Sequence, residues 1–187
     1  MMKHLLMTAA AVAFSFGLAA MDLPVQNSDF VETNGKLTGW NKSVQTKIGD
    51  SVAVEPVPGE KDEFAIVLAS TTGKSWPCVW QRLVKVSDLP AIPAGKTMVI
   101  ELEYKQKTEN VTGVAFGTLA FFDAKGKRLM YKDGVNMKGT QDWQKRKTVF
   151  QVKQIPQGAA TLGIAFYLGK STGKTWFADP DLEVEIK

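Results

Sequence analysis

The feature that most constrains this chain is a period of two in its apolar residues, which recurs along nearly its whole length. Met98, Ile100 and Leu102 alternate with Val99, Glu101 and Glu103, and 162–168 repeats the pattern. Such alternation is typical of strands with one buried face, and no sustained helical period follows residue 20. About ten short runs, separated by Gly, Pro, Asn and Asp, favour antiparallel sheets. The sequence therefore predicts an all-β fold, a two-sheet antiparallel jelly-roll β-sandwich.

The first twenty residues differ from the rest. Lys3 and His4 precede an apolar run over 5–18, and small residues follow at 17–20. This order predicts a secretory signal peptide over 1–20 and a single domain over 21–187, secreted to the periplasm or the extracellular space. No later run approaches the roughly 20 apolar residues that a membrane span needs, so we expect no membrane span.

Removal of that segment has chemical consequences. His4 is the only histidine, so catalysis by a Ser-His-Asp or Cys-His arrangement and histidine-ligated zinc are excluded. Cys78 is the only cysteine, which excludes an internal disulfide. We expect its side chain to be buried as a small apolar group. The net charge of +4 becomes +3 without Lys3, and the lysines are spread along the chain. We expect a monomer that does not bind nucleic acid.

The stretch 75–83 is the candidate site, because it holds two of the five tryptophans directly after a turn. Aromatic rings bind sugars by stacking on the C–H face of a pyranose, and polar neighbours fix its orientation. Trp76 precedes Pro77 in a polar loop, whereas Trp80 shares its parity with Val84 and Val86, which favours burial. The candidate ligand-binding residues are Trp76, Trp80, Gln81, Arg82, Phe121 and Tyr167.

Small residues on neighbouring strands predict a groove. Tyr167 shares its strand face with Gly163, Ala165 and Gly169, and a second small set, Gly113, Ala115 and Gly117, lies on 112–122. Such residues lower the surface, so Tyr167 or Phe121 would stand up as a wall. The alternative is that another layer packs closely there.

Carboxylate pairs offer the only enzymatic alternative. Glu101 and Glu103 lie roughly 7 Å apart by strand rise, a spacing that glycoside hydrolysis permits. Lys105 and Lys107 continue the same face, which favours a solvated surface of alternating charge. We therefore expect no enzymatic activity. The three remaining tryptophans lie at strand boundaries, and we expect them to pack in the core or at its rim; they are Trp40, Trp143 and Trp176.

Several segments, taken in order, resemble carbohydrate-binding modules of families 4, 9 and 22. The segments that carry the resemblance are 27–30 with Gly39-Trp40, Trp76 with Gln81, Phe122-Asp123 with Gly126-Lys127, 142–152, and 176–182. The resemblance implies a glycan bound along a concave sheet face, with the family's aromatic residues falling on Trp76 and near Tyr167. It also implies a structural calcium ion at Asp179, although the family's second acidic ligand falls on Val31.

Two functions remain open at this point. The chain is either a non-catalytic carbohydrate-binding protein that binds a polysaccharide or oligosaccharide, or a jelly-roll domain used for cell-envelope structure or protein contact without a glycan site. The observation that separates them is whether Trp76, Trp80 and Tyr167 are exposed along one groove.

Overall fold

The computed structural model describes residues 20–61 and 63–187, so the expected signal peptide lies, apart from Ala20, outside the described residues. Strands dominate, and none of the helices in the described ranges is long and apolar enough to cross a membrane. The elements are β1 (Met21–Asp22), β2 (Glu32–Thr33), β3 (Lys36–Leu37), β4 (Asn41–Ser43), the 3₁₀ turn η1 (Thr46–Ile48), β5 (Asp50–Pro56), β6 (Phe64–Ser70), β7 (Cys78–Lys85), the 3₁₀ turn η2 (Val86–Asp88), β8 (Met98–Val111), β9 (Val114–Asp123), β10 (Arg128–Asp133), β11 (Gly139–Val152), β12 (Ala159–Gly169) and β13 (Gly173–Ile186).

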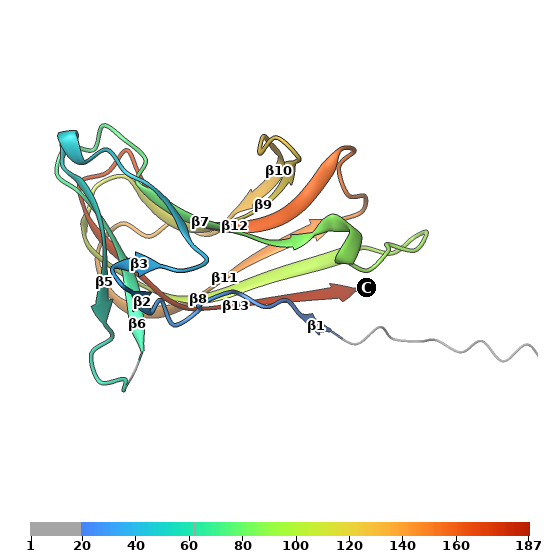
Figure 1. Ribbon diagram of the computed structural model, residues 1–187, viewed down its shortest axis with the longest axis horizontal. Helices are drawn as coiled ribbons and strands as arrows, with labels where there is room; N and C mark the ends of the chain where they lie inside the picture. Colours follow the sequence, from blue (N-terminus) through green and yellow to red (C-terminus); the bar gives the residue numbers. More distant parts are fainter. Residues whose placement is uncertain (1–19, 62) are drawn as a thin grey trace, which may run out of the picture.

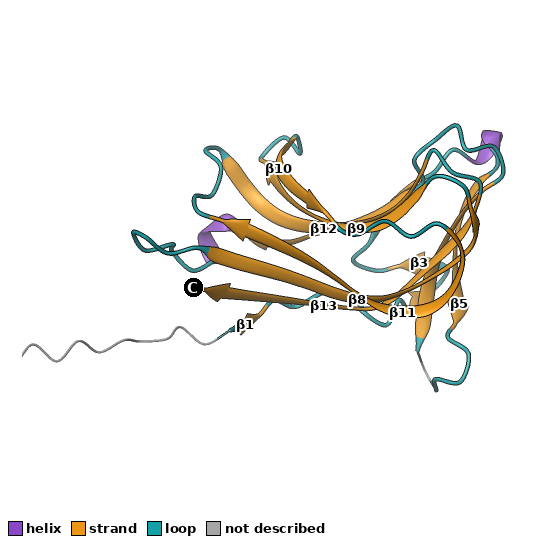
Figure 2. Ribbon diagram, turned by 180° about the vertical axis from the view of Figure 1, so that it is seen from behind, coloured by secondary structure: helices purple, strands orange, loops and turns teal. Residues whose placement is uncertain are grey.

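Two antiparallel sheets face each other. One has the order β11-β8-β13-β6-β5, with β1 pairing to β13, and the other has the order β10-β9-β12-β7-β4. The chain repeatedly crosses between them, from β6 to β7 to β8, and again from β11 to β12 to β13. This is the jelly-roll sandwich that the alternation predicts. Figure 2 shows that the β10-β9-β12-β7-β4 sheet is curved, with its hollow side facing away from its partner sheet. We refer to that side as the concave face.

The core lies between the sheets and is formed by the apolar side chains at every second position of the long strands. Phe166 of β12 stacks on Phe177 of β13 with ring centroids 4.5 Å apart, and Trp40 stacks on Phe166 at 5.7 Å. Each of the two phenylalanines is fully buried. Burying one such ring stabilises a fold by about 1.5–3 kcal/mol, so this stack fixes how the sheets sit on each other.

One strand carries apolar residues on both faces. On β9, Ala115, Leu119 and Phe121 belong to the core, while Phe116 and Phe122 point the other way, toward the concave face. The prediction that Phe121 stands as a groove wall is therefore wrong. Its ring is fully buried, and its centroid lies 5.9 Å from the centroid of the Phe150 ring.

Candidate functional site

The concave face is a regular grid of side chains from four paired strands. One row across the sheet runs through Trp80, Ala165, Thr118 and Asp133, as the strand registers show. The neighbouring row on one side joins Cys78, Tyr167 and Phe116, and the row on the other side joins Arg82, Gly163, Ala120 and Tyr131. In the first and third of these rows the middle strands β12 and β9 carry small residues, whereas in the second row they carry Tyr167 and Phe116.

The expected groove floor is correct for one strand and wrong for the other. Gly163 and Ala165 share the concave face with Tyr167, as their parity predicts. On β9, however, Ala115 lies in the core, and a Cβ on Gly117 would meet the Tyr104 ring on the core side. The sequence has the right strands but assigns the faces of β9 the wrong way round.

A pocket of about 390 Å³ opens on the concave face, and aromatic residues form most of its wall. Trp76 and Tyr131 are 45% and 51% exposed, although large apolar side chains are usually covered. Tyr167 is half-buried between them, and its ring lies 5.7 Å from that of Phe116, measured between centroids. The lining residues are Trp76, Phe116, Arg128, Tyr131, Asp133 and Tyr167.

The Trp76 ring is held by its neighbours although one side faces solvent. It meets Tyr167 edge to face, with 6.3 Å between ring centroids. Gly169 lies directly beneath it, since a Cβ at that position would overlap the six-membered ring of the indole. Backbone bonds Leu168 N–H to Pro77 O (3.0 Å) and Lys170 N–H to Ser75 O (2.9 Å) fix the segment against β12. The exposed ring is thus preorganised, which lowers the entropy lost on binding.

The contact of the Trp76 ring with Gly169 leads to a first prediction. Gly169→Ala should weaken the binding of a ligand that stacks on Trp76 about three- to tenfold, because the new methyl group forces the Trp76 ring out of its place. The melting temperature should change little. A double-mutant cycle with Trp76→Ala, followed by affinity titration, measures the effect. If Gly169 acts through Trp76, the double variant should bind no worse than Trp76→Ala alone. Additive losses would contradict the role of Gly169 in positioning the Trp76 ring.

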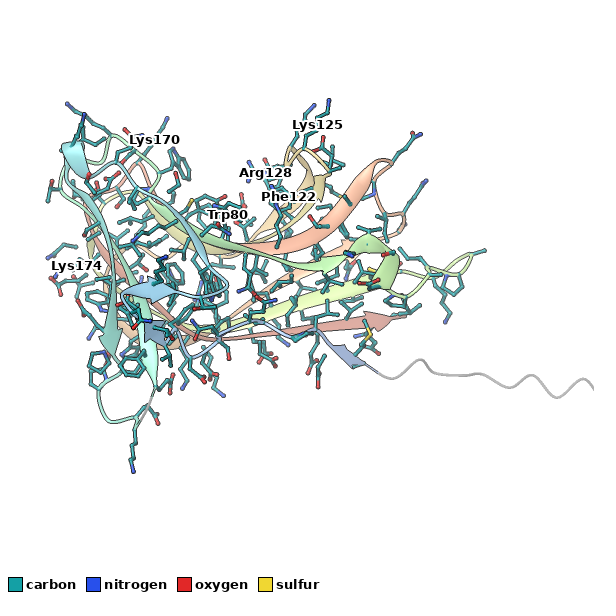
Figure 3. The ribbon with its side chains drawn as sticks, viewed as in Figure 1. Trp80, Phe122, Lys125, Arg128, Lys170 and Lys174 are labelled. Atoms are coloured by element: carbon teal, nitrogen blue, oxygen red, sulfur yellow. The ribbon has the colours of Figure 1, made fainter. Side chains whose placement is uncertain are left out.

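A second aromatic cluster lies beside the pocket, and Figure 3 shows Trp80 and Phe122 near each other on the concave side. The Arg82 guanidinium lies 5.3 Å from the ring centroid of Trp80 and 5.3 Å from that of Phe122. The turn before β10 closes over it, since a Cβ on Gly126 would collide with the guanidinium. Such contacts of a cation with ring faces hold the side chain in one position.

Trp80 is half-buried on the concave face, whereas parity with Val84 favours the core. The reason is a β-bulge. Leu162 pairs with Val84 but Gly163 pairs with Arg82, so Leu83 is an extra residue in the register. Because a bulge inserts one extra residue, the alternation of side chains between the two faces shifts by one residue beyond it. Trp80 and Arg82 therefore face outward, while Val84 packs against the core.

Gln81 does not belong to the site, which corrects the prediction. It is 2% exposed, and its side chain faces the core side of β7. Its amide NH₂ donates to Gln26 O at 2.9 Å and Gly39 O at 3.0 Å, and its Oε1 accepts from Gln26 N–H at 2.9 Å. Gln81 is thus a structural clamp between β7 and the segment that follows β1.

The pocket includes four residues that the sequence reasoning did not select, namely Phe116, Arg128, Tyr131 and Asp133. Phe116 lies on β9, and the other three lie on β10, a short strand after a hairpin turn. The signal available was pairing: once β9 and β10 are joined by the turn, Tyr131 must stand opposite Ala120 on the same face. Asp133 accepts a hydrogen bond from the Thr118 hydroxyl at 2.8 Å, which fixes its carboxylate at the rim.

Burial raises the pKa of Tyr167, so its phenol is neutral at pH 7 and can donate a hydrogen bond. Cys78 is buried, as expected, and burial raises the pKa of its thiol to about 11. A thiol with so high a pKa carries almost no thiolate at neutral pH and is a poor nucleophile.

The carboxylates Glu101 and Glu103 lie on the opposite sheet. Lys147 contacts both of them, with Nζ 2.6 Å from Glu101 Oε2 and 2.7 Å from Glu103 Oε1. These hydrogen bonds raise the pKa of the Lys147 ammonium. The prediction of a solvated surface of alternating charge is confirmed.

Asp179, the expected calcium ligand, lies beside the ammonium group of Lys105. It sits at a bulge of β13 with a left-handed φ of 52°. Its Oδ2 lies 3.5 Å from Lys105 Nζ, which also contacts Glu63 at 3.0 Å. Across residues 20–61 and 63–187, no three acidic, histidine or cysteine side chains are grouped to hold a metal ion. Val31 is an exposed apolar residue. These donors do not fit a calcium ion, which takes six to eight oxygens.

We therefore expect calcium to leave stability unchanged. Adding millimolar Ca²⁺, or a chelator, should shift the melting temperature by less than about 1 °C, because a ligand stabilises only a fold that binds it. Differential scanning fluorimetry of the full chain measures this shift. A rise with Ca²⁺ that the chelator reverses would contradict the expectation.

No protein-family model matches the sequence, and a search of curated proteins finds no significant match. Solved structures do resemble the fold. A Stig cyclase from Fischerella sp. TAU is similar with a TM-score of 0.61 at 14% identity, over 89% of this chain and 98% of that one. The CBM22-1 xylan-binding domain from Paenibacillus barcinonensis is similar with a TM-score of 0.51 at 14% identity, over 88% of this chain and 93% of that one.

A third similar structure belongs to a much longer protein. The enzymatically active domain of tailspike protein 4 of bacteriophage CBA120 gives a TM-score of 0.55 at 17% identity. The match covers 78% of this chain but 19% of that chain. At these identities the likeness shows the fold alone: a jelly-roll sandwich of the kind that carbohydrate-binding modules use, and that cyclase and tailspike proteins also contain.

Proposed function

We propose that this protein is a secreted, non-catalytic carbohydrate-binding protein that holds a polysaccharide or oligosaccharide on its concave face. Sugar rings stack on Trp76 and Tyr131, and Tyr167 offers a neutral hydroxyl between them. Arg128 and Asp133 at the pocket rim can hydrogen-bond sugar hydroxyls. The resemblance to modules of families 4, 9 and 22 and the fold of the xylan-binding domain support the same function.

The observation that carries the proposal is the pair of exposed rings. Among the described residues, the exposed large apolar side chains are Val31, Trp76, Tyr131 and Val135, and both aromatic ones border the same pocket. Leaving such rings in water gives up stabilisation that burial would supply. An exposed cluster with polar residues around it is the usual form of a binding surface. A domain used only for envelope structure has no need of it.

The chemistry of the pocket favours binding over catalysis. Asp133 is the one carboxylate among the residues that line the pocket, and Thr118 holds it by a hydrogen bond. Hydrolysis of a glycosidic bond uses two carboxylic groups on either side of that bond. Glu101 and Glu103 lie on the other sheet, where Lys147 engages both.

A glycan array tests the proposal. The mature protein, residues 21–187, should bind a related group of glycans, and Trp76→Ala should lose those signals. A protein that binds no glycan on the array, and none of a panel of soluble polysaccharides in affinity electrophoresis, would support the alternative of a structural or protein-contact domain.

A further inference from the structure

The two faces of the sandwich differ in how many of their cations are paired with acids. On the six-stranded sheet, Lys105 contacts Glu63 and Asp179, and Lys147 contacts Glu101 and Glu103, whereas Lys145 and Lys174 show no ion pair in the described part of the chain. On the concave face, the described part of the chain shows no ion pair for Arg82, Lys125, Arg128 or Lys170. Figure 3 shows the last three on the hollow side of the sheet. These four cations of the concave face are therefore not paired with an acidic side chain.

The acids that do lie near this face are already engaged. Asp123 Oδ1 accepts from the backbone N–H of Lys125 at 2.9 Å and of Lys127 at 2.8 Å, which builds the turn before β10. Asp133 accepts from Thr118. An acid that is bound to its own backbone or to a hydroxyl still contributes charge, but it does not pair with the arginines.

Two arginines are held in place by rings. Arg82 lies between Trp80 and Phe122, and the Arg128 guanidinium lies 4.0 Å from the centroid of Tyr131. Both side chains are exposed. A guanidinium that stacks with one face on an aromatic ring keeps its N–H groups free along its edge, and that planar fork matches a carboxylate with two parallel hydrogen bonds.

The two arginines come close to the same part of the concave face, beside the turn that joins β9 to β10. The Arg82 side chain reaches from β7 across Gly163 of β12, because its guanidinium contacts the Phe122 ring of β9 and would collide with a Cβ on Gly126 in that turn. Arg128 pairs with the same Phe122 in the sheet register. A ligand lying along this hairpin would therefore contact both arginines, with aromatic rings next to each.

We infer that the ligand is an acidic polysaccharide, a polyuronate whose carboxylates pair with Arg82 and Arg128 while its rings stack on the neighbouring aromatic residues. This inference rests on the proposed function and narrows it from glycans in general to carboxylated ones. Lys125 and Lys170 at the rims add longer-range attraction, which salt screens.

Affinity electrophoresis and calorimetry with polygalacturonate test the inference, with neutral xylan and dextran sulfate as the other arms. Polygalacturonate should bind best, and raising NaCl from about 50 to 500 mM should weaken binding several-fold. Arg82→Gln and Arg128→Gln should each weaken binding about tenfold. Lys174→Gln is the matched control, because Lys174 lies 6.0 Å from the Trp176 centroid outside this face. It should leave binding unchanged.

The other outcomes separate the two proposals. Binding to xylan but not to polygalacturonate would overturn the inference and leave the proposed function standing. Stronger binding to dextran sulfate than to polygalacturonate would overturn the choice of carboxylate. Equal binding to duplex DNA would show attraction to any polyanion and overturn it too. Binding to none of these three polysaccharides would overturn the inference, and the absence of any signal on the glycan array would overturn the proposed function as well.

Discussion

Replacing Trp76 with alanine should weaken glycan binding roughly 10- to 100-fold while the fold stays intact. The ring presents its free face to the pocket, and covering such a face with a sugar is worth about 1.5–3 kcal/mol. Its contribution to stability is smaller, since it is 45% exposed, and it packs on Tyr167 and Gly169. We expect the free energy of unfolding to fall by about 1 kcal/mol or less.

The matched control is Trp143→Ala. Trp143 is half-buried and packs against the small cluster around Trp176, on the sheet away from the concave face. That variant should lose stability and keep its affinity, measured by titration calorimetry and thermal denaturation of both proteins. A large fall in melting temperature for Trp76→Ala, with affinity per folded molecule preserved, would show that Trp76 is a packing residue and not a stacking platform.

Replacing Gln81 with alanine should have the opposite effect, a large loss of stability with no direct loss of affinity. The substitution removes three hydrogen bonds and leaves the N–H and C=O of Gln26 and the C=O of Gly39 without their partner. Buried polar groups that lose a partner cost about 1–3 kcal/mol each, and water reaches some of these. We expect a loss of about 2–4 kcal/mol, or about 5–15 °C in melting temperature.

The neighbouring residue provides the contrast. Arg82 points to the concave face and is exposed, so Arg82→Ala should change the melting temperature by no more than about 2 °C. Thermal denaturation of the two variants, followed by titration with the glycan, compares the two sides of one strand. Equal stability of Gln81→Ala and the unsubstituted protein would contradict the clamp.

The sandwich itself follows from the sequence because alternation fixes which residues a strand can bury. On β12, Leu162 to Leu168 is apolar at every second position and small or aromatic between, so both the core and the concave face are readable. On β9, Leu119, Phe121, Phe116 and Phe122 make both parities apolar. Packing across the sandwich decides between them: Phe121 of β9 packs on Phe150 of β11, which belongs to the other sheet.

The candidate site was predictable to a similar degree. Trp76 and Tyr167 were identified because one sits in a polar loop and the other rises among small residues. Trp80 is also among the candidates, but its spacing from Val84 and Val86 favours burial, and its place on the concave face depends on the bulge at Leu83, which no local pattern marks. Tyr131 required the pairing of β10 with β9, since its own strand carries no clear alternation of exposed and buried residues. Bulges and edge-strand pairing are tertiary features, so a single sequence does not reveal them.

The most direct test of the central claim is a titration that reports on each tryptophan separately. In an NMR spectrum of ¹⁵N-labelled protein, the five indole N–H groups give one signal each, and variants assign them. Adding the preferred glycan should shift the signals of Trp76 and Trp80. The signals of Trp40 and Trp176, whose indoles donate to Asn27 O and Glu55, should stay in place. Shifts confined to Trp143 and Trp176 would place the ligand away from the concave face and contradict the account.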